Sequence, residues 1–155
     1  MKISIIKPNA KHTNDISRIC ATGWRQTVQG VHSEAYQLKN VEYWYNHKRV
    51  LEDIEKGTYT HVALVDDKVA GTIGGIMTAP NISEIYVFYV DEVFRYKGIG
   101  TKLLHEFTNI HINCGATEQV VSVEEGNTLG IPFYLSHGFR QREQDKRYWR
   151  KIGNK

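Results

Sequence analysis

Residues 82–114 read ISEIYVFYV-DEVFRYKGIG-TKLLHEFTNIHINC, and this stretch decides the fold. Its first part, Ile82 to Val90, is rich in β-branched and aromatic residues and predicts a strand. A helix is expected to begin near Gly98, because apolar residues then recur at spacings of three and four. A short apolar run at 119–123 predicts another strand, so this strand–helix–strand unit would be parallel and right-handed. The predicted core-facing stripe of the helix is Ile99, Leu103, Phe107, Ile110 and Cys114.

The hexapeptide RYKGIG, residues 95–100, joins the strand to the helix. A turn that needs positive φ explains its two glycines. Alternatively, free N–H groups and the helix dipole at the helix start bind a phosphate, with Arg95 and Lys97 adding positive charge. Two familiar phosphate motifs are absent, because Leu103 stands where a third glycine would fall and no Gly-Lys-Ser/Thr follows. The hexapeptide alone therefore leaves both interpretations open.

The composition describes a globular protein that we expect to form a single domain over residues 1–155. A net charge of +3, with the charges scattered, falls short of a nucleic-acid-binding surface. The basic stretch 140–151 is instead predicted to be a final pair of strands. The apolar run near the N-terminus is broken by Pro8, which argues against a signal peptide or membrane span and favours a cytoplasmic protein. Both cysteines, Cys20 and Cys114, lie in apolar stretches and are expected to be buried free thiols.

The rest of the chain predicts the element order β-α-α-β-β-β-α-β-α-β-β, a mixed sheet with helices on its faces, of the α/β class. A first helix is expected to be capped within Thr13–Asp15, and a second to run from Val41 to Glu55 with Trp44 inward and to stop at Gly57. Asp66-Asp67 predicts the turn of a hairpin. Pro132 is tolerated only in a first turn, so a short helix should begin near Gly130. The remaining strands are expected at 3–7, 139–143 and 148–152.

Two blocks of the sequence resemble the GNAT superfamily of N-acetyltransferases. The stretch from Val90 to Gly100 is similar to the family signature Arg/Gln-x-x-Gly-x-Gly/Ala, which follows a strand and opens a helix. A later block is similar to Asn-x-x-Ala-x-x-Phe-Tyr-x-x-x-Gly-Phe, with Gly130 at the position of the usual Ala. Glu92 and Tyr96 depart from the Pro and Gly often found in the first block. The second block comprises Asn127, Gly130, Phe133, Tyr134, Gly138 and Phe139. The resemblance implies the GNAT-type acyl-CoA N-acyltransferase fold over nearly the whole chain.

The resemblance also implies that acetyl-CoA is the acetyl donor. The N–H groups of residues 95–101 would hold its pyrophosphate, and its pantetheine arm would lie between two strands that splay apart. Phe88 matches the position whose N–H polarises the thioester carbonyl, and Asn127 matches a residue that touches the arm. The implied cofactor-binding residues are Phe88, Tyr89, Val90, Arg95, Tyr96, Lys97, Gly98, Ile99, Gly100, Thr101 and Asn127.

Tyr134 matches the family's general acid, which protonates the departing thiolate. A phenol with an ordinary pKa of about 10 can protonate a thiolate whose conjugate acid has a pKa of about 8.5. A packing role for the tyrosine is the alternative. Glu84 is the candidate base, because its offset from Arg95 resembles that of the glutamate base in the histone-acetylating branch of the family. A period of two would place it on one strand face with Tyr86, Phe88 and Val90. Two alternatives remain: water molecules relay the proton in place of Glu84, or Glu84 is an exposed carboxylate at the start of the strand with no part in the reaction.

The acceptor amine is not readable from the sequence and belongs to a small molecule or a protein. Side chains of the region 23–46 are candidates for its pocket, with core packing as the alternative: Trp24, Gln29, Glu34, Tyr36, Tyr43 and Tyr45. The spacing of the seven histidines does not suggest a metal site. A non-catalytic acyl-CoA-binding module on the same fold is the rival function, no nucleic-acid or membrane partner is expected, and a homodimer is left open.

Overall fold

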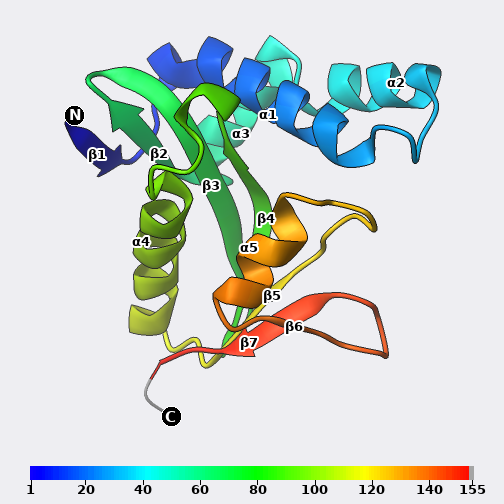
Figure 1. Cartoon of the computed structure of the whole chain (residues 1–155). Coiled ribbons are helices and arrows are strands. Elements are labelled where there is room, and N and C mark those ends of the chain that lie inside the picture. The colour runs from blue at the N-terminus through cyan, green and yellow to red at the C-terminus, as the bar shows by residue number, and fades with distance from the viewer. Residues whose placement is uncertain (154–155) are drawn as a thin grey trace.

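The computed structural model describes residues 1–153 and contains a mixed sheet in the order β1-β2-β3-β4-β5-β7-β6 (Figure 1). Only the β4–β5 pairing is parallel, and the other neighbours are antiparallel. The strands are β1 (Ile3–Ile6), β2 (Tyr59–Val65), β3 (Lys68–Ala79), β4 (Ile82–Val90), β5 (Glu118–Val121), β6 (Arg140–Gln141) and β7 (Tyr148–Lys151). The helices are α1 (Thr13–Val28), α2 (Glu34–Trp44), α3 (His47–Lys56), α4 (Ile99–Asn113) and α5 (Gly130–Ser136), with short 3-10 turns η1 (Ala10–His12) and η2 (Glu92–Phe94).

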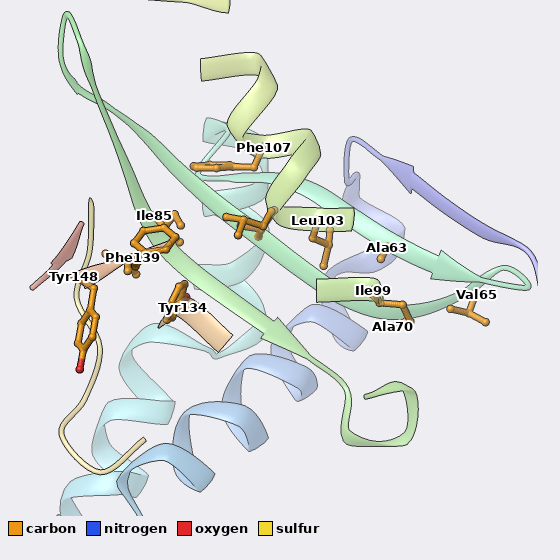
Figure 2. Packing of buried hydrophobic residues seen from close by; sticks show 13 residues of the cluster. Ala63, Val65, Ala70, Ile85, Ile99, Leu103, Phe107, Tyr134, Phe139 and Tyr148 are labelled. Carbon is orange, nitrogen blue, oxygen red and sulfur yellow. The ribbon is translucent and has the colours of Figure 1, made fainter. Parts of the chain in front are cut away.

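Helices cover both faces of this sheet, and each face has its own apolar core. On one face, Leu103 and Phe107 of α4 pack with Tyr134 of α5 and Phe139, as Figure 2 shows. On the other face, α1 and α3 contribute a second cluster that includes Ile16 and Val50 and that packs on β2 and β4. The predicted α/β architecture and the parallel β4–α4–β5 unit are therefore confirmed. No helix within residues 1–153 is long and apolar enough to cross a membrane.

The predicted helix 41–55 is in fact two helices, α2 and α3, with a break at Tyr45–Asn46. Asn46 causes the break, because its side-chain oxygen accepts a hydrogen bond from Arg49 N at 2.8 Å and caps α3. Trp44 ends α2 and is 44 % exposed, so its predicted core position was wrong. Gly57 ends α3 in the left-handed conformation, as predicted. The cap of α1 also differs, because Asn9, rather than Thr13 to Asp15, caps the preceding turn η1.

The buried face of α4 ends differently from the predicted stripe. Ile99, Leu103 and Phe107 are buried, but Ile110 is 51 % exposed and Cys114 lies at the surface. The face continues instead through His111, four residues after Phe107, whose Nδ1 lies 2.6 Å from Ser83 Oγ of β4. A buried polar partner in the sheet therefore replaces the apolar contact that the spacing predicted, and only Cys20 of the two thiols is buried.

A β-bulge interrupts β4 at Tyr86. Gly74 pairs with Val87 and Gly75 with Ile85, so Tyr86 has no partner in β3. Ile85 and Phe88 contact the core beneath α4, whereas Val87 and Tyr89 belong to the cluster beneath α1 and α3. The bulge therefore reverses the alternation of side chains, and the prediction that Glu84, Tyr86, Phe88 and Val90 share one face was wrong.

Candidate active site

The site is built where β4 and β5 separate. The two strands pair only from Ile82 to Ile85 on β4 and from Glu118 to Val121 on β5. Beyond the bulge, β4 keeps its pairing with β3, but the edge toward β5 has no strand partner. Backbone groups on such an edge are free to bind an extended ligand. This gap is the predicted splay between the two strands.

A cavity of about 490 Å³ extends from this gap to the start of α4. Gly98 caps α4 with φ of +80°, and the first N–H groups of the helix have no intrahelical partner. Tyr96 also has positive φ and points its ring into solvent. Gly100 allows α5 to approach α4, because a Cβ there would lie 3.2 Å from the Phe133 ring. The cavity is lined by most of the predicted cofactor residues: Phe88, Tyr89, Val90, Arg95, Tyr96, Gly98, Ile99, Gly100, Thr101 and Asn127.

The two cations of the hexapeptide are placed differently. Arg95 lines the cavity, but its guanidinium is tied to α1, with Nη2 donating to Gln26 Oε1 at 2.7 Å. Gln26 in turn donates to Glu92 Oε2 at 2.9 Å. Lys97 is exposed and does not line the cavity. We call residues 95–101, at the start of α4, the cradle. Its positive character therefore comes from backbone N–H groups and the N-terminal end of the α4 dipole, with Arg95 anchored beside it.

A second cavity, of about 560 Å³, lies between the bulged part of β4 and the helices α1, α2 and α3. Aromatic rings dominate its walls, and five of the nine tyrosines of the chain line it. Trp24 and Tyr45 were expected here, but Gln29, Glu34, Tyr36 and Tyr43 do not line it. The five tyrosines are Tyr45, Tyr59, Tyr86, Tyr89 and Tyr134, and the residues shared with the first cavity are Thr27, Phe88, Tyr89, Asn127 and Tyr134.

Tyr134 lies where the two cavities meet. Its side chain is buried, and its ring contacts those of Phe88, Phe133 and Phe139, with centroids 5.2 to 6.2 Å apart. Burial raises the pKa of its hydroxyl above the ordinary value, so the phenol stays protonated at neutral pH. Tyr134 is therefore a neutral phenol in the wall that the two cavities share.

Glu84 lies on the sheet face covered by α1 and α3, because its neighbours Ser83 and Ile85 both face α4. Its Oε2 is 3.0 Å from Arg147 Nη1, in the loop between β6 and β7. It does not line the second cavity, although Ile85 and Tyr86 do. Glu84 is therefore held in an ion pair with Arg147 and is not part of the wall of the second cavity.

Asn127 lines both cavities and also accepts hydrogen bonds from the backbone at the start of α5. Its Oδ1 accepts hydrogen bonds from Leu129 N at 3.2 Å and Gly130 N at 2.7 Å. Gly130 makes room for this arrangement, because a Cβ at residue 130 would lie 2.9 Å from Asn127 Cγ. The unusual glycine in the second block therefore fits the inward position of the asparagine.

A family model described as "Acetyltransferase (GNAT) family" matches residues 21–139, which include both sequence blocks and both cavities. The chain belongs to the GNAT family. It is accordingly an acetyl-CoA-dependent N-acetyltransferase, and acetyl-CoA is its acetyl donor. The fold and family expected from the sequence are thus confirmed. Within residues 1–153, no group of three or more His, Cys, Asp or Glu side chains is arranged to hold a metal ion.

Relatives of this GNAT protein include the spermidine N(1)-acetyltransferase of Thermoplasma acidophilum. It is 25% identical over 150 residues, which cover 94% of this chain and 92% of that protein. A crystal structure of PaiA N-acetyltransferase from Thermoplasma acidophilum in complex with coenzyme A superimposes with a TM-score of 0.88, at 24% identity, over 98% of this chain and 100% of that one. An acetyltransferase of the GNAT family from Staphylococcus aureus gives a TM-score of 0.73 at 20% identity, over 98% and 100% of the two chains.

Proposed function

We propose that this GNAT enzyme acetylates a primary amine of a small, positively charged molecule, by direct attack of the amine on acetyl-CoA in a ternary complex. The observation that carries the proposal is the meeting of two cavities at Phe88, Tyr89 and Tyr134. One cavity leads to the start of α4, and the other opens between α1, α2 and α3. Donor and acceptor therefore reach the reacting centre by separate routes, as direct transfer requires.

The donor lies in the first cavity. Its pyrophosphate binds the free N–H groups at the start of α4, with Gly98 and Gly100 allowing close approach. Its pantetheine arm follows the unpaired edge of β4 through the gap beside β5, with Asn127 along its path. The thioester then lies at Phe88, next to Tyr134. This placement uses Phe88, Gly98, Gly100 and Asn127 of the predicted cofactor residues.

The reaction follows from these positions. The amine nitrogen attacks the thioester carbon, and the negative charge that develops on the carbonyl oxygen is stabilised by the Phe88 N–H. When the tetrahedral intermediate collapses, the C–S bond breaks and the sulfur takes a proton from the Tyr134 hydroxyl. Before the attack, the ammonium form of the acceptor loses one proton to Glu84 through water, or to water alone, because Glu84 lies outside the cavity wall. After the attack, the nitrogen loses a second proton, which returns through water to the Tyr134 phenolate and restores its hydroxyl. The products are an acetamide and coenzyme A.

The acceptor class rests on the cavity and on one relative. Aromatic walls suit alkylammonium groups, through contact with carbon chains and attraction of cations to ring faces. The spermidine N(1)-acetyltransferase related to this chain supports a polyamine-like acceptor over a protein side chain.

An acceptor screen tests the proposal. The purified protein is incubated with acetyl-CoA and a panel of polyamines, monoamines, amino acids and lysine peptides. Release of the coenzyme A thiol and the mass of each product are followed. Acetylation of small di- or polyamines is expected. Acetyl-CoA binding without turnover on any amine would favour the rival, a non-catalytic acyl-CoA-binding module.

A further inference from the structure

One carboxylate lies in the wall of the second cavity, called the acceptor cavity from here on, on the side of α2 and α3. Asp53, near the end of α3, is 8 % exposed and lines the cavity. Its Oδ2 accepts a hydrogen bond from Arg49 Nε at 3.0 Å. Within residues 1–153, no other side chain or backbone group donates to this carboxylate. Because a carboxylate accepts several hydrogen bonds, Asp53 keeps acceptor capacity on the cavity side.

Arg49 already places a cation at this position. Its guanidinium carbon lies 4.4 Å from the centroid of the Trp44 ring and 5.3 Å from that of Tyr43. Trp44 also lines the cavity, which accounts for a large aromatic side chain left exposed at the end of α2. The carboxylate and the ring face therefore form a place suited to a positive charge, and the protein's own arginine occupies it.

The charge of the cavity favours a second cation. Its charged lining residues are Asp53, Glu124 and Arg49, so the carboxylates outnumber the guanidinium. Glu124 comes from the loop after β5, on the side of Asn127 and Tyr134. A diamine whose reacting nitrogen lies at Phe88 would extend its other ammonium group along the cavity toward α3.

We propose that Asp53 and the face of Trp44 form a subsite for the second ammonium group of a di- or polyamine acceptor. Arg49 competes with the acceptor for this subsite. The proposal rests on the proposed function, since it assumes that the second cavity takes the amine. It assigns opposite roles to two residues of one ion pair, because Asp53 attracts the distal ammonium group and Arg49 opposes it.

Binding and turnover, measured separately, test this subsite. Isothermal titration with coenzyme A present compares putrescine with n-butylamine, which share a carbon chain and differ by one ammonium group. Asp53→Asn should weaken putrescine binding by roughly tenfold or more, the loss of a hydrogen bond to a charged group, and leave n-butylamine binding unchanged. Arg49→Met should tighten putrescine binding. Asp67→Asn, in the exposed β2–β3 turn, is the matched control and should change neither.

Several results would overturn the subsite. The ion pair of Asp53 and Arg49 would be merely structural if Asp53→Asn weakened the binding of both amines equally. The same conclusion would follow if Arg49→Met bound putrescine more weakly than the wild type. If an amino acid bound tightly and Arg49→Met abolished that binding, Arg49 would instead bind the carboxylate of the acceptor. Arg49→Met alone decides the matter if Asp53→Asn does not fold. Turnover assays with the same amines stand apart, because selective putrescine binding without acetylation would reject the proposed function and leave the subsite intact.

Discussion

Gly23 of α1 lies directly against the ring of Tyr89. A Cβ at residue 23 would overlap Tyr89 Cδ1 and lie 3.0 Å from Cγ. Tyr89 is a wall residue of both cavities, and its ring meets that of Tyr45 edge to face at 6.4 Å. Glycine inside a helix costs about 0.5–1 kcal/mol relative to alanine. The close approach of Tyr89 explains why the helix has glycine here.

Gly23→Ala should therefore impair the enzyme. The added methyl group pushes the Tyr89 ring toward the junction of the cavities, and kcat/KM should fall by about tenfold to a hundredfold, as for other small displacements at a reacting centre. The double variant Gly23→Ala/Tyr89→Leu removes the clash and should recover part of the loss. Steady-state kinetics with thermal melting measure both. A kcat/KM equal to that of the wild type in Gly23→Ala would show that the ring moves without consequence.

Tyr134→Phe should lower kcat by about a hundredfold or more, the usual contribution of a general acid. The KM values should change little, because the ring and its contacts with Phe88 and Phe139 remain. Tyr148→Phe is the matched control, since Tyr148 is buried in the same core and lines neither cavity. If Tyr134→Phe and Tyr148→Phe had the same kcat, Tyr134 would be a packing residue.

Glu84→Gln tests the proposed base. If Glu84 receives the amine proton through water, kcat should fall and the acidic limb of the pH–rate profile should disappear. Glu52→Gln, on the exposed side of α3, should leave the profile unchanged. An unaltered profile in Glu84→Gln would remove Glu84 from the mechanism and leave its ion pair with Arg147 as a purely structural contact.

The two thiols should differ in reactivity. Cys20 is fully buried, and burial raises the pKa of its thiol above the ordinary value. Cys114 is exposed at the end of α4. A thiol reagent should label Cys114 alone in the native protein and both cysteines in urea, and Cys114→Ser should abolish native labelling. Rapid labelling of Cys20 in native Cys114→Ser would show that the core beneath α1 opens readily.

The sequence predicted β4 and the start of α4 well, because alternation, apolar spacing and Gly98 all act locally. It did not predict the bulge at Tyr86, which depends on how β3 meets β4. The Gly74-Gly75 pair was the available signal, since glycines inside a strand often mark a bulge or a close backbone approach. Val90 lies on the same face of β4 as Phe88, as predicted, whereas Glu84 lies on the opposite face.

The acceptor cavity was harder to predict than the cofactor cradle. The cradle comes from one continuous stretch, residues 95–101, whereas the aromatic walls come from α1, α2, β2, β4, α5 and the turn at Tyr45. Tyr59 and Asp53 had no local pattern that marked them. The packing of α3 against β2 brings them to the cavity, and such packing is decided only in the folded chain.

His111 makes the stability of this protein depend on pH. It is buried against Ser83, and burial together with nearby His61 lowers its pKa below the ordinary value of about 6.5. The folded state therefore holds His111 neutral, while the unfolded chain binds a proton first. Its contribution to stability is fully present above about pH 6.5 and is lost as the pH falls toward the lower pKa of the folded state.

Urea unfolding at neutral and at mildly acidic pH measures this loss. The free energy of unfolding should fall on acidification in the wild type, and less so in His111→Gln, which keeps a polar group for Ser83 but does not titrate. Part of the loss should persist in the variant, because burial lowers the pKa of His61 as well. His105→Gln, at an exposed position of the same helix, should retain the full loss. Equal acid sensitivity of His111→Gln and the wild type would show that other groups cause it.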